Sequence, residues 1–379
     1  MVVAWCGASP HLQKAGNTMR VALIHDFLLQ YGGAERVLQV FKEMYPDSVI
    51  YTLCFNPDAF PDSWMQMNII PLMPILPGID RYPQFYAPYL VAKMRSISLA
   101  DFDLVISSDT IFSKMVNSPP GVMHICYQYS PADMLYHFLP SSRSRNWLHL
   151  LFTGLQKSFL RREDYFASQL PERFITLSHF VGHRINKYYR RDYSVIYPPV
   201  SLNDFVTPTG AGEYYLLVGR LVPNKLIDLA VNCCTKYDLP LVVLGNGEEI
   251  NYLRSLAGKS VRFITDATDP VRNQVYALCK ALLVCNEEDF GITPVEAMSY
   301  GRGVIAYRRG GVEETVVANE TGLFFEEQTI ESLYTAIKRF NVITIDAITC
   351  RKQAEKFSRT VFISKIRAVI DELRLQRVV

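Results

Sequence analysis

Acidic side chains are concentrated in one short segment that directly follows the apolar run 282–285. Glu287, Glu288, Asp289 and Glu296 all lie there. Carboxylates at the end of a buried strand lose hydration unless they face a polar partner, so their position indicates a polar ligand. This segment is the first candidate for a binding site.

The same segment also predicts the start of a helix. Thr293, Pro294 and Glu296 have the spacing of a capping box with proline at the first helical position. Glu296 therefore has a structural interpretation as well as a functional one. The two are compatible, because a helix start fixed in this way presents backbone N–H groups from about Gly291 and Ile292 onward to a phosphate.

Two cations follow another predicted strand, 215–218. Arg220 and Lys225 lie in a turn that begins at Gly219, where an arginine fork and a lysine point charge can together hold a diphosphate. Solvation at the surface is the alternative. Gly33 and Gly245 also follow predicted strands; each marks a tight turn, and we consider phosphate contact at Gly33 as well.

Alternating apolar strands and amphipathic helices predict two doubly wound α/β domains with parallel sheets, covered on both faces. The domains are expected at 19–198 and 199–356, with the linker at Pro198-Pro199. Residues 1–18 are expected to be an extension without regular structure. The last stretch, about 345–376, is expected to be helical, and 357–379 to cross back to the first domain. The predicted strands are 20–25, 48–53, 104–108, 123–127, 174–178, 215–218, 241–244, 261–264, 282–285, 304–307 and 323–325.

Ligands of such sheets bind at the carboxyl ends of the strands, and two sheets in tandem direct these ends toward a shared cleft. His25, Asp26 and Asp109 follow strands of the first domain. They are candidates for contact with an acceptor molecule, with turn capping as the alternative. His124, by contrast, lies inside a predicted strand and is expected in the core.

Composition excludes several classes of protein. There are 39 Lys+Arg against 37 Asp+Glu, a formal net charge of +2, which argues against a general nucleic-acid binder. No apolar run reaches the ~20 residues of a transmembrane helix, and no secretory signal is recognisable. The cysteines have no metal-ligand spacing and are expected to be reduced thiols. A cytoplasmic protein is therefore expected.

A family resemblance appears in the acidic segment. Seven residues separate Glu288 from Glu296, with Phe290 and Gly291 between them. This resembles the E-x7-E signature of retaining glycosyltransferases of family 4, or group 1, which have the GT-B fold. The resemblance covers the chain from Met19. It is closest to bacterial enzymes of exopolysaccharide or envelope-polysaccharide assembly. Further matches in order and spacing are the Pro-Pro linker, Gly219-Arg220 with Lys225, the segment 310–314 and the returning helix near residue 357.

The resemblance implies roles for individual residues. Arg220 and Lys225 would bind the diphosphate and act with Glu288, which would hold the hydroxyls of the donor hexose. Glu296 would bind the ribose, and the base would lie near Asp266. No metal or other cofactor is implied, because the two cations and two helix N-termini neutralise the leaving diphosphate. The other implied donor-site residues are Gly33, Gly219, Gly245, Phe290, Gly291, Ile292 and Thr293.

One position departs from the family pattern. Tyr129 stands where a histidine often lies near the transferred sugar. Tyrosine can hydrogen-bond the sugar, but it does not replace a histidine, and Tyr129 joins the candidates for sugar or acceptor contact.

The sequence thus predicts a retaining transferase that moves a hexose from a nucleotide diphosphate sugar to a lipid-linked oligosaccharide, with 19–198 binding the acceptor and 199–356 the donor. UDP-glucose is favoured over GDP-mannose; an epimerase of the same fold and an inactive nucleotide-sugar-binding protein are further alternatives. Basic and aromatic residues in 81–95 and 143–162 are candidates for peripheral contact with an anionic membrane, or they form ordinary solvated helices.

Overall fold

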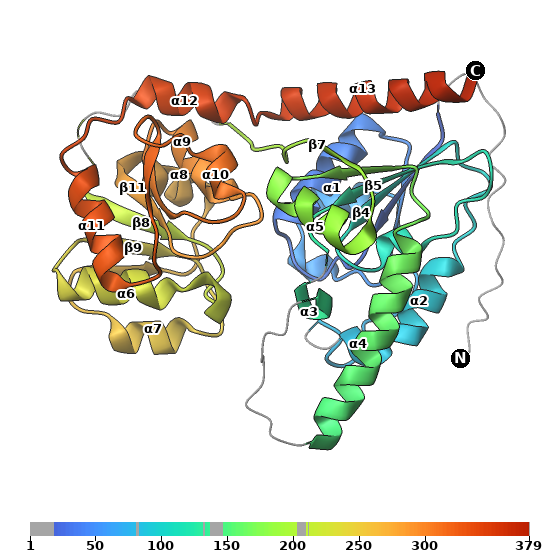
Figure 1. The fold of residues 1–379 in the computed structure, drawn as a ribbon, viewed down its shortest axis with the longest axis horizontal. Coiled ribbons are helices and arrows are strands. Elements are labelled where there is room, and N and C mark those ends of the chain that lie inside the picture. The colour runs from blue at the N-terminus through green and yellow to red at the C-terminus, as the bar shows by residue number, and fades with distance from the viewer. Residues whose placement is uncertain are drawn as a thin grey trace.

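The structure is a computed structural model that describes residues 19–80, 83–131, 133–136, 147–202, 210 and 212–378. Two α/β domains lie side by side, and the long helix α13 (Arg359–Val378) runs along the first domain (Figure 1). The predicted extension 1–18 lies outside the described residues. No helix within these ranges is both long and apolar enough to cross a bilayer.

The first domain is built on a seven-stranded sheet in the order β3-β2-β1-β4-β5-β6-β7, and every neighbouring pair is parallel. All residues of β1, β4 and β5 are buried, as expected for central strands covered on both faces. The strands are β1 (Val21–His25), β2 (Val49–Thr52), β3 (Ile69–Pro71), β4 (Leu104–Asp109), β5 (Met123–Gln128), β6 (Arg173–Thr176) and β7 (Tyr193–Val195).

Helices cover this sheet with apolar faces. In α1, Val37, Leu38 and Phe41 recur at helical spacing and are buried. The helices of the domain are α1 (Gly33–Met44), α2 (Ala87–Arg95), α3 (Asp133–Tyr136), α4 (Trp147–Ala167) and α5 (His179–Tyr189), with a 3-10 turn, η4, at Ser113–Met115.

The second domain has a six-stranded parallel sheet in the order β10-β9-β8-β11-β12-β13. Its strands are β8 (Tyr214–Val218), β9 (Leu241–Leu244), β10 (Val261–Ile264), β11 (Cys279–Val284), β12 (Gly303–Tyr307) and β13 (Gly322–Phe325). Its helices are α6 (Ile227–Lys236), α7 (Ile250–Leu256), α8 (Asp269–Leu278), α9 (Ile292–Ser299), α10 (Val312–Thr315), α11 (Ile330–Phe340) and α12 (Ala347–Glu355).

The predicted pair of doubly wound parallel sheets is confirmed, with differences at the edges. The edge strands β3 and β7, three residues each, were not predicted, and β7 ends at Val195, shortly before the expected linker at Pro198-Pro199. The last helical stretch is two helices, because the buried Phe357 interrupts it and its carbonyl accepts a hydrogen bond from Val200 N–H (2.9 Å). After this break α13 packs on the first domain, where Phe362 contacts Phe41.

His124 on β5 is only 1% exposed, which confirms its expected place in the core. Burial lowers its pKa from 6.5 to about 4, although the charge of Asp109 opposes the shift. The unfolded chain therefore binds the proton more readily, and stability present above pH 6.5 is lost as the pH falls toward 4. We expect the free energy of unfolding to drop by about 2 kcal/mol from pH 7 to pH 5 through this residue.

The His124→Asn variant isolates this effect. Denaturant unfolding of wild type and variant at both pH values should show a smaller loss in the variant. Equal losses in the two proteins would exclude His124 as the source.

Candidate active site at the carboxyl ends of the strands

Four loops at the carboxyl ends of β8, β9, β11 and β12 meet in the second domain. Gly245 has φ +148°, and a Cβ there would lie 1.9 Å from the carbonyl oxygen of Gly219. Gly310, after β12, has φ +93°, and a Cβ there would lie 2.3 Å from the carbonyl oxygen of Glu288. Only glycine permits this packing, so the glycines bring the loops that carry the predicted donor residues into direct contact. Asp266 lies exposed after the edge strand β10.

Lys225 and Glu288 form the centre of this group. Lys225 Nζ donates to Glu288 Oε1 (2.6 Å), which also accepts from Asn286 Nδ2 (3.1 Å). Both side chains keep partial exposure, 26% and 20%. Arg220 is exposed and forms no ion pair with a described residue. A cation pair and a carboxylate that are open to solvent at one sheet edge can receive a phosphorylated, hydroxyl-rich ligand.

Helix α9 starts differently from the prediction. It begins at Ile292, after Gly291 adopts a left-handed conformation with φ 87°, and it has no side-chain cap. Thr293 and Pro294 therefore lie within the first turn, where the missing proline N–H costs nothing. The capping-box interpretation of Glu296 is wrong. Phe290 is 3% exposed and stacks on Tyr197 of the linker, so only its backbone is near the site.

Glu296 instead faces the first domain. Its carboxylate accepts hydrogen bonds from Arg36 Nη1 on α1 (3.0 Å) and from the Tyr276 hydroxyl (2.6 Å). The start of α1 is close as well: a Cβ at Gly33 would lie 2.8 Å from Ile292 Cδ1. The two helix starts that were predicted to face a diphosphate thus meet across the domain junction.

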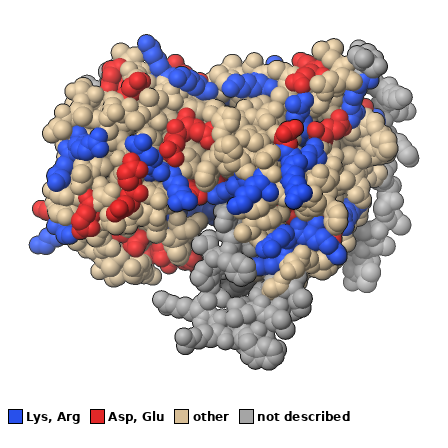
Figure 2. Space-filling view, in the orientation of Figure 1, with Lys and Arg blue, Asp and Glu red and all other residues tan. Residues whose placement is uncertain are grey.

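The other acidic residues also join the domains. Arg184 on α5 binds Glu287 (2.8 Å) and Asp289 (2.9 Å), and Arg309 binds Glu287 from the other side (3.0 Å). Glu314 accepts backbone hydrogen bonds at the start of α5 (2.9 Å each). Acidic and basic side chains lie close together near this junction (Figure 2). The acidic segment is an ionic contact between the domains as well as a candidate ligand site.

Replacing Arg184 by methionine should favour separation of the domains. The two carboxylates are partly exposed, so the ion pairs are weak. We expect the equilibrium between domains in contact and domains apart to shift toward separation by about 1 kcal/mol, or about fivefold. Small-angle scattering should show a larger radius of gyration, and added salt should produce the same change in wild type. Arg308→Met, which breaks a pair with Glu326 inside the second domain, should leave the radius unchanged. Equal radii for the Arg184 variant and wild type would contradict the contact's role.

In the first domain, His25 and Tyr129 belong to one chain of hydrogen bonds beneath α1. The Tyr129 hydroxyl donates to Ala34 O (2.9 Å) and lies 2.8 Å from Ser108 Oγ, which lies 3.0 Å from His25 Nδ1. Because Tyr129 donates to a carbonyl, Ser108 donates to Tyr129 and accepts from His25. Burial raises the pKa of Tyr129, so its hydroxyl keeps its proton. The chain holds the helix start that carries Gly33.

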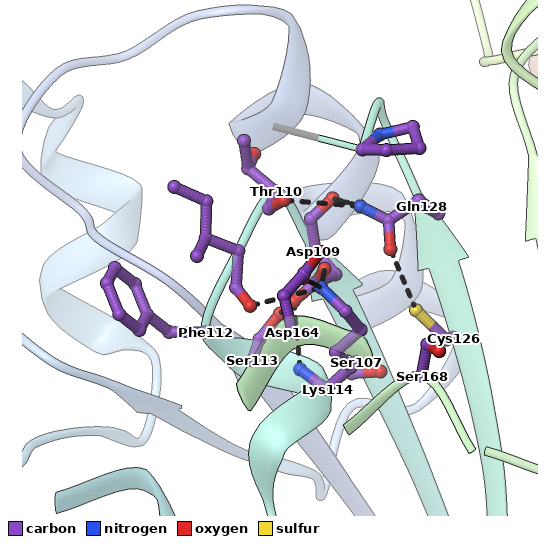
Figure 3. Close-up of polar contacts among 12 residues, drawn as sticks. Ser107, Asp109, Thr110, Phe112, Ser113, Lys114, Cys126, Gln128, Asp164 and Ser168 are labelled. Atoms are coloured by element: carbon purple, nitrogen blue, oxygen red, sulfur yellow. Dashed lines mark hydrogen bonds and ion pairs between the residues drawn. The ribbon is translucent and has the colours of Figure 1, made fainter. Parts of the chain in front are cut away.

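Asp26 and Asp109 are used inside the domain, and Figure 3 shows Asp109 with its neighbours. The carboxylate of Asp26 accepts three backbone N–H groups of residues 111–113 at 2.6 to 3.1 Å. Asp109 is 0% exposed, accepts from Lys114 N–H (2.8 Å) and binds Lys114 Nζ (2.7 Å). Lys114, equally buried, also binds Asp164 (2.6 Å). Both aspartates therefore fit the alternative interpretation, turn capping, because both hold turns below the surface.

Sequence reasoning missed the first-domain partners of the acidic segment, Arg36 and Arg184. A usable signal existed for Arg36, which lies three positions after Gly33 and so on the same side of α1. No spacing connects Arg184 with residues more than a hundred positions away.

Comparison with known proteins gives the class. Residues 205–357, most of the second domain, match the family model described as Glycosyl transferases group 1. Glycogen synthase 2 of Geobacter metallireducens is 30% identical over 138 residues, 32% of this chain and 28% of that protein. The mouse alpha-1,3/1,6-mannosyltransferase ALG2 is 24% identical over 266 residues, 60% and 61% of the two chains.

The two described domains together have the GT-B fold. The crystal structure of Anabaena Alr3699/HepE in complex with UDP-glucose superimposes with a TM-score of 0.67 at 17% identity, over 93% of this chain and 99% of that one. This chain matches only 28% of the length of the Geobacter glycogen synthase and 35% of that of a glycogen synthase from Pseudomonas savastanoi.

Proposed function

We propose that the protein is a retaining glycosyltransferase of family 4 that transfers a hexose from a nucleotide diphosphate sugar. The observation that carries this is the Lys225–Glu288 pair beside the exposed Arg220, at the carboxyl ends of β8 and β11 in a domain that matches the group 1 family model. The pair offers a cation for phosphate and a carboxylate for sugar hydroxyls at the same place.

In this proposal each group has one task. Arg220 and Lys225 hold the diphosphate, and backbone N–H groups at the starts of α1 and α9 assist them without a metal ion. Glu288 holds the hexose through its hydroxyls. The ribose competes with Arg36 for Glu296, so that donor binding changes the contact between the domains.

The transfer proceeds on one face of the sugar. The bond between the anomeric carbon and the diphosphate oxygen breaks, and the bond to the acceptor oxygen forms on the same face. The acceptor's proton moves to the departing diphosphate oxygen, so no protein nucleophile is required. The carboxylates position the donor and stabilise developing charge.

UDP-glucose is the favoured donor. A protein of the same fold has been crystallised with UDP-glucose, whereas the match to a mannosyltransferase over 60% of the chain supports GDP-mannose as the second candidate. We propose a lipid-linked oligosaccharide of polysaccharide assembly as the acceptor, and peripheral contact with the inner face of the cell membrane.

A panel of nucleotide sugars without acceptor tests the donor proposal. Thermal stabilisation by UDP rather than GDP identifies the base, and slow nucleotide release from one donor identifies the sugar. A protein that neither is stabilised by any of these compounds nor releases nucleotide would overturn the proposal.

A further inference from the structure

A basic and aromatic cavity lies on the flank of the first domain. Its volume is about 560 Å³. It is formed where α3, the C-terminal part of α4 and the end of α5 meet, a region of this face where Lys and Arg side chains gather (Figure 2). The lining residues are Tyr136, Arg161, Tyr165, Lys187, Tyr188 and Arg190.

Aromatic rings shape the cavity and hold its cations. Tyr136 and Tyr188 are stacked with centroids 4.2 Å apart. The Arg161 guanidinium lies 5.8 Å from the Tyr136 ring, and Lys187 Nζ lies 5.1 Å from the Tyr188 ring. Arg161 is also fixed by the carbonyl oxygen of Leu135, which its Nε contacts at 3.0 Å. Arg161 is therefore already oriented before a ligand arrives, which lowers the cost of binding.

The three cations are not neutralised by neighbouring carboxylates. Among the residues that the structure describes, none of Arg161, Lys187 and Arg190 forms an ion pair. The acidic residues of α4 have other partners: Asp164 binds Lys114, and Glu163 binds Arg95 and Arg162. Residues 137–146, which include Arg143 and Arg145, lie outside the described residues, as does Arg81.

Helix stability explains only part of this cluster. The negative end of the α5 dipole favours a cation at Lys187. It does not explain Arg161, which comes from another helix. At Arg190, the C-cap of the same helix, the dipole also favours a cation, but the φ of 55° is a left-handed position at which glycine is preferred. A ligand that bears negative charge gives all three cations one common role.

We propose that this cavity binds a phosphate group carried on an apolar or ring-bearing body, with the cations on the phosphate and the tyrosines along the body. It lies at the C-terminal end of α5, whereas the second domain contacts the first half of that helix, at His179, Phe180 and Arg184, so the cavity is separate from the donor site. The source of the phosphate is a lipid headgroup or a free phosphorylated compound. Only the lipid source rests on the membrane contact proposed above.

The double variant Lys187→Ala with Arg190→Gly tests the site, because glycine suits the backbone at 190 and both changes are at the surface. Its matched control, Arg254→Ala with Lys259→Ala, removes the same charge from the second domain. One arm measures flotation with vesicles of phosphatidylglycerol or of phosphatidylcholine alone. The second arm is a calorimetric titration of the protein with inorganic pyrophosphate. The donor site is first saturated with UDP or GDP, whichever stabilises the protein, so that pyrophosphate cannot bind there.

If the phosphate belongs to a lipid, wild type floats with the anionic vesicles and the site variant binds them about 30-fold more weakly, at about 1 kcal/mol for each cation. If it belongs to a free compound, pyrophosphate binds wild type and not the site variant. The charge control keeps wild-type behaviour in either case. The proposal is overturned if the site variant and the control variant behave alike in both arms. If both variants still bind the donor nucleotide, that result leaves the proposed function intact.

Discussion

Replacing Lys114 by methionine is expected to lower the free energy of unfolding by about 3 to 5 kcal/mol, the cost of removing one partner from a buried ion pair. The Lys114 ammonium is fully buried and binds Asp109, Asp164 and the carbonyl oxygen of Ile111. Burial raises the pKa of Asp164, and that of Lys114 is also raised because two carboxylates outweigh its own desolvation. Without the lysine, two carboxylates remain in the core with no cation.

Denaturant unfolding measures this effect. Asp164→Asn should cost less than the lysine change, because Lys114 keeps Asp109 and the Tyr136 hydroxyl keeps a partner at position 164. This milder variant also gives a reading if the first does not fold. Lys236→Met removes an exposed lysine paired with Glu331 and should leave the midpoint unchanged. A Lys114 variant that unfolds at the wild-type midpoint would contradict the description of this cluster.

Replacing Glu288 by glutamine is expected to reduce turnover of the donor sugar by at least a hundredfold, as for the loss of one preorganised electrostatic contact. The amide fills the same space and can still accept from Lys225 and Asn286. It removes the negative charge that opposes Lys225 and that holds the sugar hydroxyls. Donor affinity should change much less than turnover, because Arg220 and Lys225 still hold the diphosphate.

Nucleotide release from the preferred donor measures this loss. Glu326→Gln, on the same domain but paired with Arg308, should release nucleotide at the wild-type rate. The site assignment fails if a folded Glu288→Gln or Arg220→Ala variant releases nucleotide as fast as wild type.

The sheets could be predicted because their signal is local. Buried parallel strands are near-continuous apolar runs, and β4, β5, β9 and β10 began at the residues that the pattern indicated. The edge strands β3 and β7 are three residues long and partly exposed, so no apolar run marks them. Their existence depends on pairing with β2 and β6, which is not local information.

The site was predictable in its residues and not in its contacts. Glu288 and Lys225 are 63 positions apart, and family spacing indicated both. Asp109 is buried because it pairs with Lys114, five positions later in the sequence. No sequence pattern indicates that this lysine is itself buried. Glu296 and Arg36 are 260 positions apart in sequence, and their contact depends on the relative position of the two domains.

The central claim is that a nucleotide sugar binds at the carboxyl ends of the second sheet. Amide hydrogen exchange with and without saturating donor tests it most directly, because it reports which backbone segments become protected. We predict protection in 219–225 and 286–296, with a smaller change at the start of α1 near Gly33. Protection confined to the first domain, or unchanged exchange in both segments under saturation, would contradict the claim.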